Sequence, residues 1–351
     1  MAIDISQQAQ SEALKLDWIR EAELAAGSIR PGRRGLTLDE INVGTSGDVP
    51  MTTRNSTFAP RGAQRRPETP HNGMIYNDRA SVWSENAALL YEEAVQRQWS
   101  SATEIPWELV QPLPDDLELA MSQLCTFLTE VEFIAGDAPG QWTPSVSADF
   151  FETKLYLATQ VVDEARHLDV FRKRALVNGG GLLQQGPGTG LRNILASLEF
   201  TEMSVLMHIL GEGFVQTMFR AGEYIAQNDA EKRIYRLCGQ DESRHLAFGV
   251  MHLRYLIQIQ PERKEEIHSY LDRAEGLLND PRLADISMAE SLAILLGGGK
   301  HNIDEGMQKF MGIRKRQVNE YMHRLEVAGM GERRERMNPA FKPLLDPPRH
   351  N

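Results

Sequence analysis

From about residue 80 onward, apolar positions recur with the three-to-four-residue spacing of amphipathic helices. This spacing predicts helices over 80–99, 114–137, 147–177, 190–227, 229–259, 262–277, 286–296 and 303–328. Sustained alternation of apolar and polar residues between turn signals is lacking, so we expect few or no strands. Several predicted helices are long and joined by short connections, which indicates an all-α bundle.

The breaks between these helices contain residues that start or stop helices. Pro114 precedes one of them, and Asp115 and Asp116 occupy its first turn, where the helix dipole favours negative charge. The run NGGG ends another, because glycine tolerates the left-handed conformation found at helix C-termini. Pro261 stops the helix that precedes it. These boundaries agree with the periodicity.

Residues 1–75 differ from the rest of the chain. After a short helical pattern they are rich in Gly, Pro, Arg, Ser and Thr and have no sustained period. We therefore expect an N-terminal arm, partly irregular, over 1–75, a helical domain over 76–330 and a C-terminal tail over 331–351. The arginines of the arm either bind an anionic partner or, as we favour, are solvated or cover the protein's own acidic surface.

Charge and cysteine content restrict the partners and the compartment. The net charge of −11 disfavours binding to nucleic acid. The two cysteines, Cys125 and Cys238, are too few for a disulfide scaffold and are typical of a reducing compartment, so we expect a cytoplasmic protein. The first residues lack the pattern of a signal peptide. No apolar run approaches the roughly 18 residues that a membrane span needs.

Two five-residue segments, DEARH and DESRH, nearly repeat each other about eighty residues apart. In each segment a glutamate and a histidine are three positions apart and lie on one helix face: Glu164 with His167, and Glu242 with His245. A carboxylate and an imidazole placed in this way can bind one metal ion. Two such helices, together with two further helices that each contribute a glutamate, form the site of carboxylate-bridged di-metal bundles.

The predicted helix before each segment contains a candidate for the additional glutamate. Glu212 lies inside an apolar stretch, between Leu210 and Phe214. In the other helix, Glu132 shares its face with apolar residues and Glu130 with polar ones, so we prefer Glu132 and keep Glu130 as the alternative. Because lone buried charges are costly, we favour metal binding over a solvated helix face.

The other residues of the repeated segments suit the surroundings of such a site. Asp163 and Asp241 are expected to accept hydrogen bonds from the outer N–H groups of the two histidines, each across the pseudo-twofold axis. Arg166 and Arg244 are expected to pair with these aspartates and to offset the buried negative charge.

The two Asp-Glu-x-Arg-His segments resemble the ferritin-like superfamily, specifically its carboxylate-bridged di-iron oxygenases and oxidases. They look like the bacterial multicomponent monooxygenases and the acyl-carrier-protein desaturases, and EFIA at 132–135 is similar to the first-ligand pattern of the monooxygenases. YEEAVQRQW at 91–99 and ESRHLAFG at 242–249 look more like the ribonucleotide reductase small subunit and its ligand-binding oxidase relatives. The resemblance covers about 80–260 and implies a ferritin-like four-helix bundle with additional helices.

Several positions depart from these subgroups. Phe171 stands where reductase small subunits usually carry a radical tyrosine, and Met207 stands where we expect the crosslinked tyrosine of the related oxidases. Gln216 stands where the monooxygenases place a threonine, with Thr217 adjacent. The tail lacks the acidic, aromatic-ended character expected for docking a reductase large subunit. No single subgroup therefore accounts for the chain.

The resemblance implies a non-haem di-iron oxidoreductase that activates O2, its co-substrate, to oxygenate (hydroxylate, N-oxygenate) or desaturate a small organic substrate. The implied cofactors are two Fe ions, with a Mn/Fe pair as the alternative, since the ligand types suit both. An external electron donor, either a reductase or a ferredoxin, and a homodimer are implied as well. The alternatives are a radical-generating protein like the reductase small subunit and a non-catalytic metal-binding protein.

Two further questions stay open in the sequence. His208, one turn before Glu212, is either an additional ligand or, as we favour, a histidine outside the ligand set. Large apolar residues near the predicted ligands either line a substrate cavity or, as we favour, form ordinary core; they are Phe133, Phe171, Met207, Phe214 and Phe248.

Overall fold

The computed structural model describes residues 28–65, 76–186 and 192–347, together with Ile19, Thr69, His71 and Gly73. These residues belong to two compact units, divided between Asp48 and Val49. The first unit contains the short helix α3 (Leu38–Ile41) and the 3-10 turn η1 (Gly44–Ser46). The second unit contains the long helices and is the one that matters for function.

The start of the second unit lies well before residue 76, where the sequence places the start of the helical domain. Arg61 donates a hydrogen bond to Glu152 at 3.0 Å, and Arg65 forms an ion pair with Asp149 at 2.9 Å. Thr53 also donates to Asp149. These polar contacts tie residues 49–65 to the beginning of the second long bundle helix, and no local periodicity in the sequence reveals them.

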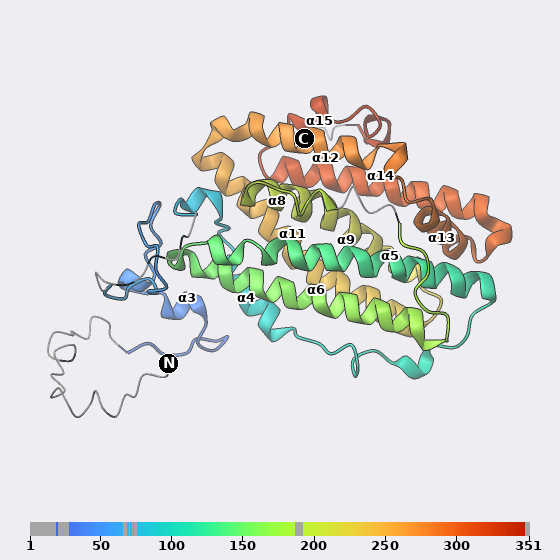
Figure 1. The fold of residues 1–351 in the computed structure, drawn as a ribbon, viewed down its shortest axis with the longest axis horizontal. Helices are drawn as coiled ribbons and strands as arrows, with labels where there is room; N and C mark the ends of the chain where they lie inside the picture. The colour runs from blue at the N-terminus through green and yellow to red at the C-terminus, as the bar shows by residue number, and fades with distance from the viewer. Residues whose placement is uncertain are drawn as a thin grey trace, which may run out of the picture. The chain divides into compact units, whose positions relative to one another are not determined.

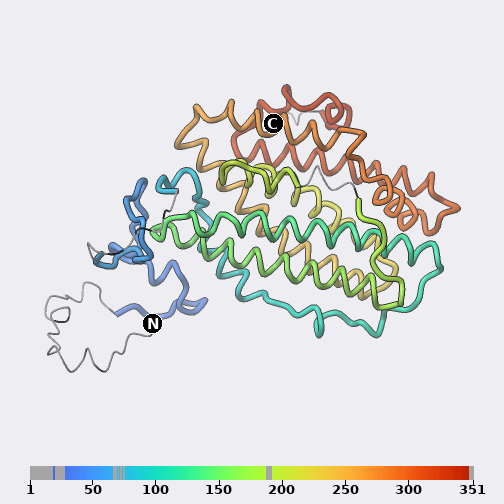
Figure 2. Tube along the Cα trace, viewed as in Figure 1, coloured from blue at the N-terminus to red at the C-terminus, as the bar shows by residue number. Residues whose placement is uncertain are grey.

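The second unit is built on four long helical segments that pack side by side (Figure 1). They are α5 (Asp115–Gly140), α6 (Phe151–Val177), the interrupted segment α8–η6–α9 (Phe200–Ser204, Val205–Gly211 and Glu212–Arg220) and α11 (Asp229–Ile259). The tube in Figure 2 shows α5 and α6 running alongside each other in opposite directions. The expected all-α, ferritin-like four-helix bundle is therefore confirmed.

Additional helices cover this bundle. A C-terminal layer packs on α5, η6 and α9 (Figure 1), and it consists of α12 (Lys264–Leu278), α13 (Ile286–Gly297), α14 (Ile303–Val327) and the short α15 (Arg333–Arg336). On another side, α4 (Ala87–Gln96) packs on α6 and α11, and α10 (Gly222–Ile225) links α9 to α11. Short 3-10 turns connect these elements: Arg79–Ser81, Trp107–Leu109, Thr143–Ser145, Ala148–Phe150, Pro261–Arg263, Pro281–Leu283, Lys300–Asn302 and Lys342–Leu344.

Within the described ranges, extended structure is limited to isolated bridges. None of the helices found there combines the length and the apolar character that a membrane crossing requires.

The predicted continuous helix over 190–227 is wrong. Its middle part, η6, is a π-helix, in which the N–H of Glu212 bonds to the carbonyl of Met207 five residues earlier. The guanidinium of Arg324 on α14 donates a hydrogen bond to the carbonyl of Ile209 at 3.1 Å. Partners from other helices thus support the wider turn, and π-helical turns of this kind occur frequently at functional sites.

One glycine allows a close helix contact at this π-helix. A Cβ atom at Gly249 on α11 would lie 2.3 Å from the Cβ of His208 on η6. Only glycine fits this approach without displacing a helix. The contact brings η6, which leads directly into Glu212, against the helix that contains Glu242.

Candidate metal centre

The six side chains predicted as ligands come together inside the bundle. They are Glu132 from α5, Glu164 and His167 from α6, Glu212 from α9, and Glu242 and His245 from α11. Each is at most 4% exposed. The packing of the four segments thus converts two sequence repeats and two isolated glutamates into one buried cluster.

The cluster divides into two overlapping groups, in each of which the donor atoms lie within 4.8 Å of one another. One group contains Glu132 and His167, the other contains Glu212 and His245, and both contain Glu164 and Glu242. Each group therefore offers three carboxylates and one imidazole. The two shared glutamates would contribute to both of two neighbouring metal positions.

The structure separates the two candidates on α5. Glu132 is 1% exposed and belongs to the cluster. Glu130 points elsewhere: it accepts a hydrogen bond from Gln185 at 2.9 Å and lies 3.7 Å from Arg192. Of the two glutamates, Glu132, which shares its face of α5 with apolar residues, is the one that lies in the cluster.

Both imidazoles present Nδ1 to the cluster. Nδ1 of His167 lies 3.0 Å from Glu164 and 3.4 Å from Glu242. Nδ1 of His245 lies 3.1 Å from Glu164 and 3.4 Å from Glu212. The Nε2 atoms therefore face away from the carboxylates.

The two aspartates of the repeated segments lie at these outer nitrogens. Nε2 of His167 is 3.2 Å from Oδ2 of Asp241, and Nε2 of His245 is 3.3 Å from Oδ2 of Asp163. Each contact runs between α6 and α11, across the pseudo-twofold axis. A carboxylate in this position fixes the tautomer of the imidazole and leaves Nδ1 as the metal-binding atom.

Two arginines and a tryptophan complete the surroundings of the aspartates. Arg244 donates to Asp163 at 2.8 Å and to Asp241 at 2.5 Å. Arg166 pairs with both aspartates as well. Trp99 donates its indole N–H to Asp241 at 2.7 Å. Sequence analysis missed Trp99, although it closes the segment YEEAVQRQW and a buried indole N–H needs an acceptor.

Several buried oxygen and nitrogen atoms of the cluster have no hydrogen-bond partner among the residues that the structure describes. They are both carboxylate oxygens of Glu132, Oε1 of Glu164, the Oε2 atoms of Glu212 and Glu242, and Nδ1 of His245. Leaving so many buried polar atoms unpaired is costly. The residues that carry them belong to the two groups whose ligand atoms lie within 4.8 Å of one another. Oxygen and imidazole donors in this number fit two transition-metal ions.

The electrostatics of the cluster lead to the same conclusion. Burial, reinforced by the charge of Glu164, raises the pKa of Glu132 well above its ordinary value. Burial also raises the pKa of Glu212, to about 8, despite the favourable charge of His245. Burial opposes ionisation of Glu164 too, but the imidazoles of His245 and His167 outweigh it and lower the pKa of this carboxyl. Without cations, the site therefore retains protons on some of its carboxyls.

His208 lies beside the cluster and outside both groups of donors. Its Nδ1 contacts Ser204 at 2.8 Å, and its Nε2 contacts Oε1 of Gln160 at 3.1 Å. Gln160 in turn donates to Glu212 at 2.8 Å. Burial lowers the pKa of His208 to about 3, so the ring is neutral. Sequence analysis missed Gln160, whose position one turn before Glu164 was the available signal.

A cavity of about 160 Å³ adjoins the cluster. Its carboxylate wall consists of Glu132, Glu212 and Glu242, and two more polar side chains, Arg314 and Gln317, come from α14. The rest of the lining is largely apolar and includes Phe127, Val131, Ile134, Ala135, Ile194, Met207, Leu210, Phe214, Val215, Met218, Leu278, Met288, Leu292, Phe310 and Ile313.

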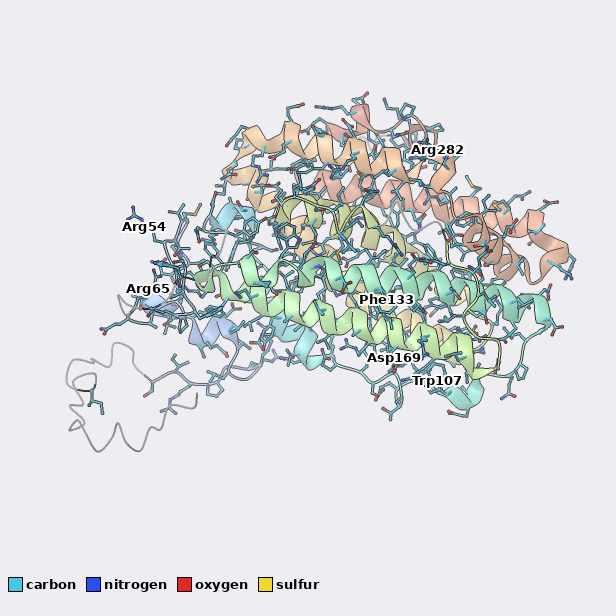
Figure 3. All side chains as sticks on the ribbon, in the orientation of Figure 1. Arg54, Arg65, Trp107, Phe133, Asp169 and Arg282 are labelled. Carbon is cyan, nitrogen blue, oxygen red and sulfur yellow. The ribbon has the colours of Figure 1, made fainter. Side chains whose placement is uncertain are left out.

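The large apolar residues near the ligands have different roles. Met207 and Phe214 line the cavity. Phe171 and Phe248 are buried in the core, at 1% and 0% exposure. Phe133 is 58% exposed on α5 (Figure 3). Met207 and Phe214 thus fit the interpretation as cavity lining, whereas Phe171 and Phe248 fit the interpretation as ordinary core.

Comparison with known proteins identifies the fold. No protein-family model and no curated protein matches the chain. Among solved structures, an R2-like ligand-binding oxidase with an aerobically reconstituted Mn/Fe cofactor matches with a TM-score of 0.55 and 14% identity, over 70% of this chain and 93% of that chain. A tyrosine-to-phenylalanine mutant of an R2-like ligand-binding oxidase, with an anaerobically reconstituted Mn/Fe cofactor, also matches with a TM-score of 0.55 and 14% identity. This match covers 70% of this chain and 94% of that chain. The chain therefore has the ferritin-like fold of R2-like ligand-binding oxidases, as its motifs implied.

Proposed function

We propose that this protein is a di-metal oxidase or oxygenase that uses O2 to oxidise a small organic substrate in the cavity beside the cluster. The observation that carries the proposal is the shared wall: Glu132, Glu212 and Glu242 belong both to the cluster and to the lining of an apolar cavity. A protein that only stores or displays metal has no need for such a cavity.

The six side chains would divide between two ions. Glu132 and His167 would hold one ion, and Glu212 and His245 would hold the other. Glu164 and Glu242 would each contribute to both ions. Two divalent cations balance the charge of the four carboxylates, which offsets the cost of burying them. An Fe/Fe or Mn/Fe pair, when bound, would supply redox electrons and open coordination positions for O2.

The surrounding residues of the chain keep this site in one arrangement. Asp241 and Asp163 hold the imidazoles by their outer nitrogens, and Arg244 holds both aspartates in place by donating a hydrogen bond to each. Gln160 orients Glu212 by donating to its Oε1. The apolar cavity walls exclude water, which protects a reactive site from side reactions. External electrons would have to come from a reductase or ferredoxin, which we include in the proposal.

The two alternatives lack an observation of this kind. A radical-generating protein of the reductase type usually carries a tyrosine at the position of Phe171, and this phenylalanine packs against Phe219. A non-catalytic metal protein leaves the adjoining cavity without a role. The oxidase proposal is compatible with a phenylalanine at position 171 and gives the cavity a role as the substrate site.

Metal reconstitution with two matched variants tests the proposal. Purified chain would be loaded anaerobically with Fe(II), or with Fe(II) and Mn(II), and metal content and O2 consumption measured. We expect two ions per chain, one for each donor group, and rapid O2 uptake. Glu132→Gln should reduce both the metal content and the O2 consumption. Glu130→Gln should change neither, because Glu130 lies on the same helix but contacts Gln185 outside the cluster. Absence of bound metal, or O2 uptake unaffected by Glu132→Gln, would refute the proposal.

A further inference from the structure

The cavity beside the cluster contains a cation that no carboxylate neutralises. Arg314 lines it from α14, and within residues 28–65, 76–186 and 192–347 no carboxylate oxygen lies within ion-pair distance of its guanidinium. Burial is the cause that lowers the pKa of Arg314. The glutamates on the cavity wall are therefore too distant to compensate its charge.

Arg314 is partly buried, and its lack of a counter-ion among the described residues contrasts with the two most deeply buried arginines. Arg174 pairs with Glu118 and Glu231, and Arg333 pairs with Glu275. Withdrawing part of a cation from water without a counter-ion has a cost. The described residues supply Arg314 with neutral contacts but no counter-ion, whereas an anionic ligand in the cavity would supply one.

The guanidinium of Arg314 is held in place by neighbours. Its Nη1 donates to Oε1 of Gln317 at 3.0 Å, and Gln317 donates to the carbonyl of Phe214 at 2.8 Å. The guanidinium carbon also lies 5.2 Å from the centre of the Phe214 ring. Gln317 and Phe214 thus orient Arg314, and further N–H donors of the guanidinium remain for a ligand.

The cavity's size limits the apolar part of that ligand. At about 160 Å³, it is comparable with an apolar cavity of roughly 150 Å³ that accepts benzene. A single ring or a short branched chain therefore fits, whereas an extended acyl chain does not. A planar carboxylate matches the guanidinium because the two form paired hydrogen bonds.

We propose that the cavity binds a small carboxylate with a ring-sized apolar body, its carboxylate group on Arg314 and its body against the metal centre. This inference names the substrate class of the proposed oxidase. The oxidation of the ligand rests on the proposed function, whereas the binding of the ligand does not. In this orientation the anionic group stays away from Glu132 and Glu212, and the C–H or N–H bonds of the body face the cluster.

Calorimetric titration with benzoate and its neutral analogue benzamide tests the inference, in both the metal-loaded and the metal-free protein. We expect benzoate to bind the wild type more tightly than benzamide. Arg314→Met should weaken benzoate binding roughly 10- to 100-fold, the range for losing a charge-assisted hydrogen-bonded pair. The same variant should leave benzamide binding unchanged, which shows that the cavity has stayed intact.

Arg316→Met is the matched control, because Arg316 lies on the same helix, is exposed and pairs with Glu320. It removes the same charge and should not affect benzoate. Benzoate binding that persists in Arg314→Met, or that depends only on the metal ions, would overturn the inference, as would tighter binding of hexadecanoate. Arg314-dependent binding in a protein that consumes no O2 would support this inference and refute the proposed oxidase function.

Discussion

Oδ2 of Asp241 lies 3.2 Å from Nε2 of His167, so a residue of one repeated segment orients the metal-binding imidazole of the other. The reciprocal pair, Asp163 and His245, is 3.3 Å apart. The repetition therefore has a geometric reason: each segment supplies a glutamate and a histidine to the cluster, and its aspartate orients the histidine of the other segment.

Replacing Asp241 tests this relationship. Asp241→Asn removes the negative charge that holds the N–H of His167, and we expect metal affinity to fall roughly 10- to 100-fold. Competition with a chromophoric chelator measures the change. Asp169→Asn is the control, because Asp169 is a half-exposed residue of α6 that pairs with Lys173 (Figure 3). Equal losses in the two variants would contradict an orienting role for Asp241.

The buried His252 should make the protein less stable in mild acid. Its Nδ1 contacts the carbonyl of Trp83 at 2.8 Å, and burial lowers its pKa from 6.5 to about 4. The native state therefore binds fewer protons than the unfolded state between these values, and stability is lost as pH falls from 6.5 towards 4. We expect a contribution of about 2 kcal/mol between pH 7 and pH 5.

Urea unfolding of metal-free protein at pH 7 and pH 5 measures this contribution. His252→Gln should reduce the pH dependence by about 2 kcal/mol, and His323→Gln should not, because the side chain of His323 is 69% exposed. An unaltered pH dependence in His252→Gln would show that other groups cause it.

Two helical glycines should respond oppositely to alanine. A Cβ atom at Gly213 would lie 2.2 Å from Nη2 of Arg324, the residue that bonds the π-helical carbonyl of Ile209. We expect Gly213→Ala to destabilise by about 1–3 kcal/mol. At Gly276 no heavy atom lies within 4 Å of the added Cβ, so Gly276→Ala should stabilise by about 0.5–1 kcal/mol. Denaturant unfolding compares them, and stabilisation by both would argue against the tight contact.

Two buried tyrosines differ in what their hydroxyl groups contact. Among the described parts of the chain, the hydroxyl of Tyr156 finds no hydrogen-bond partner, whereas that of Tyr321 donates to Glu275 at 2.8 Å. Tyr156→Phe should therefore leave the free energy of unfolding unchanged or raise it slightly, and Tyr321→Phe should lower it by about 1–3 kcal/mol. Thermal unfolding of both variants measures the difference. A large loss in Tyr156→Phe would indicate a polar contact at that hydroxyl.

Local patterns in the sequence determined most of the helical framework. The predicted helices over 114–137, 229–259 and 303–328 correspond closely to α5, α11 and α14, because each has a continuous apolar face and residues that start or stop a helix. The two Glu-x-x-His pairs were equally visible, because residues three apart share a helix face whatever the tertiary structure.

Tertiary structure decided what depends on contacts between distant segments. The π-helix before Glu212 is supported by Arg324, more than a hundred residues later, and Gln160 gains its role only where it meets Glu212 and His208. That Arg314 has no counter-ion within the described ranges is likewise a property of its surroundings. Periodicity reports which side of a helix is buried, whereas these features depend on which side chains of other helices lie opposite, and packing alone determines that.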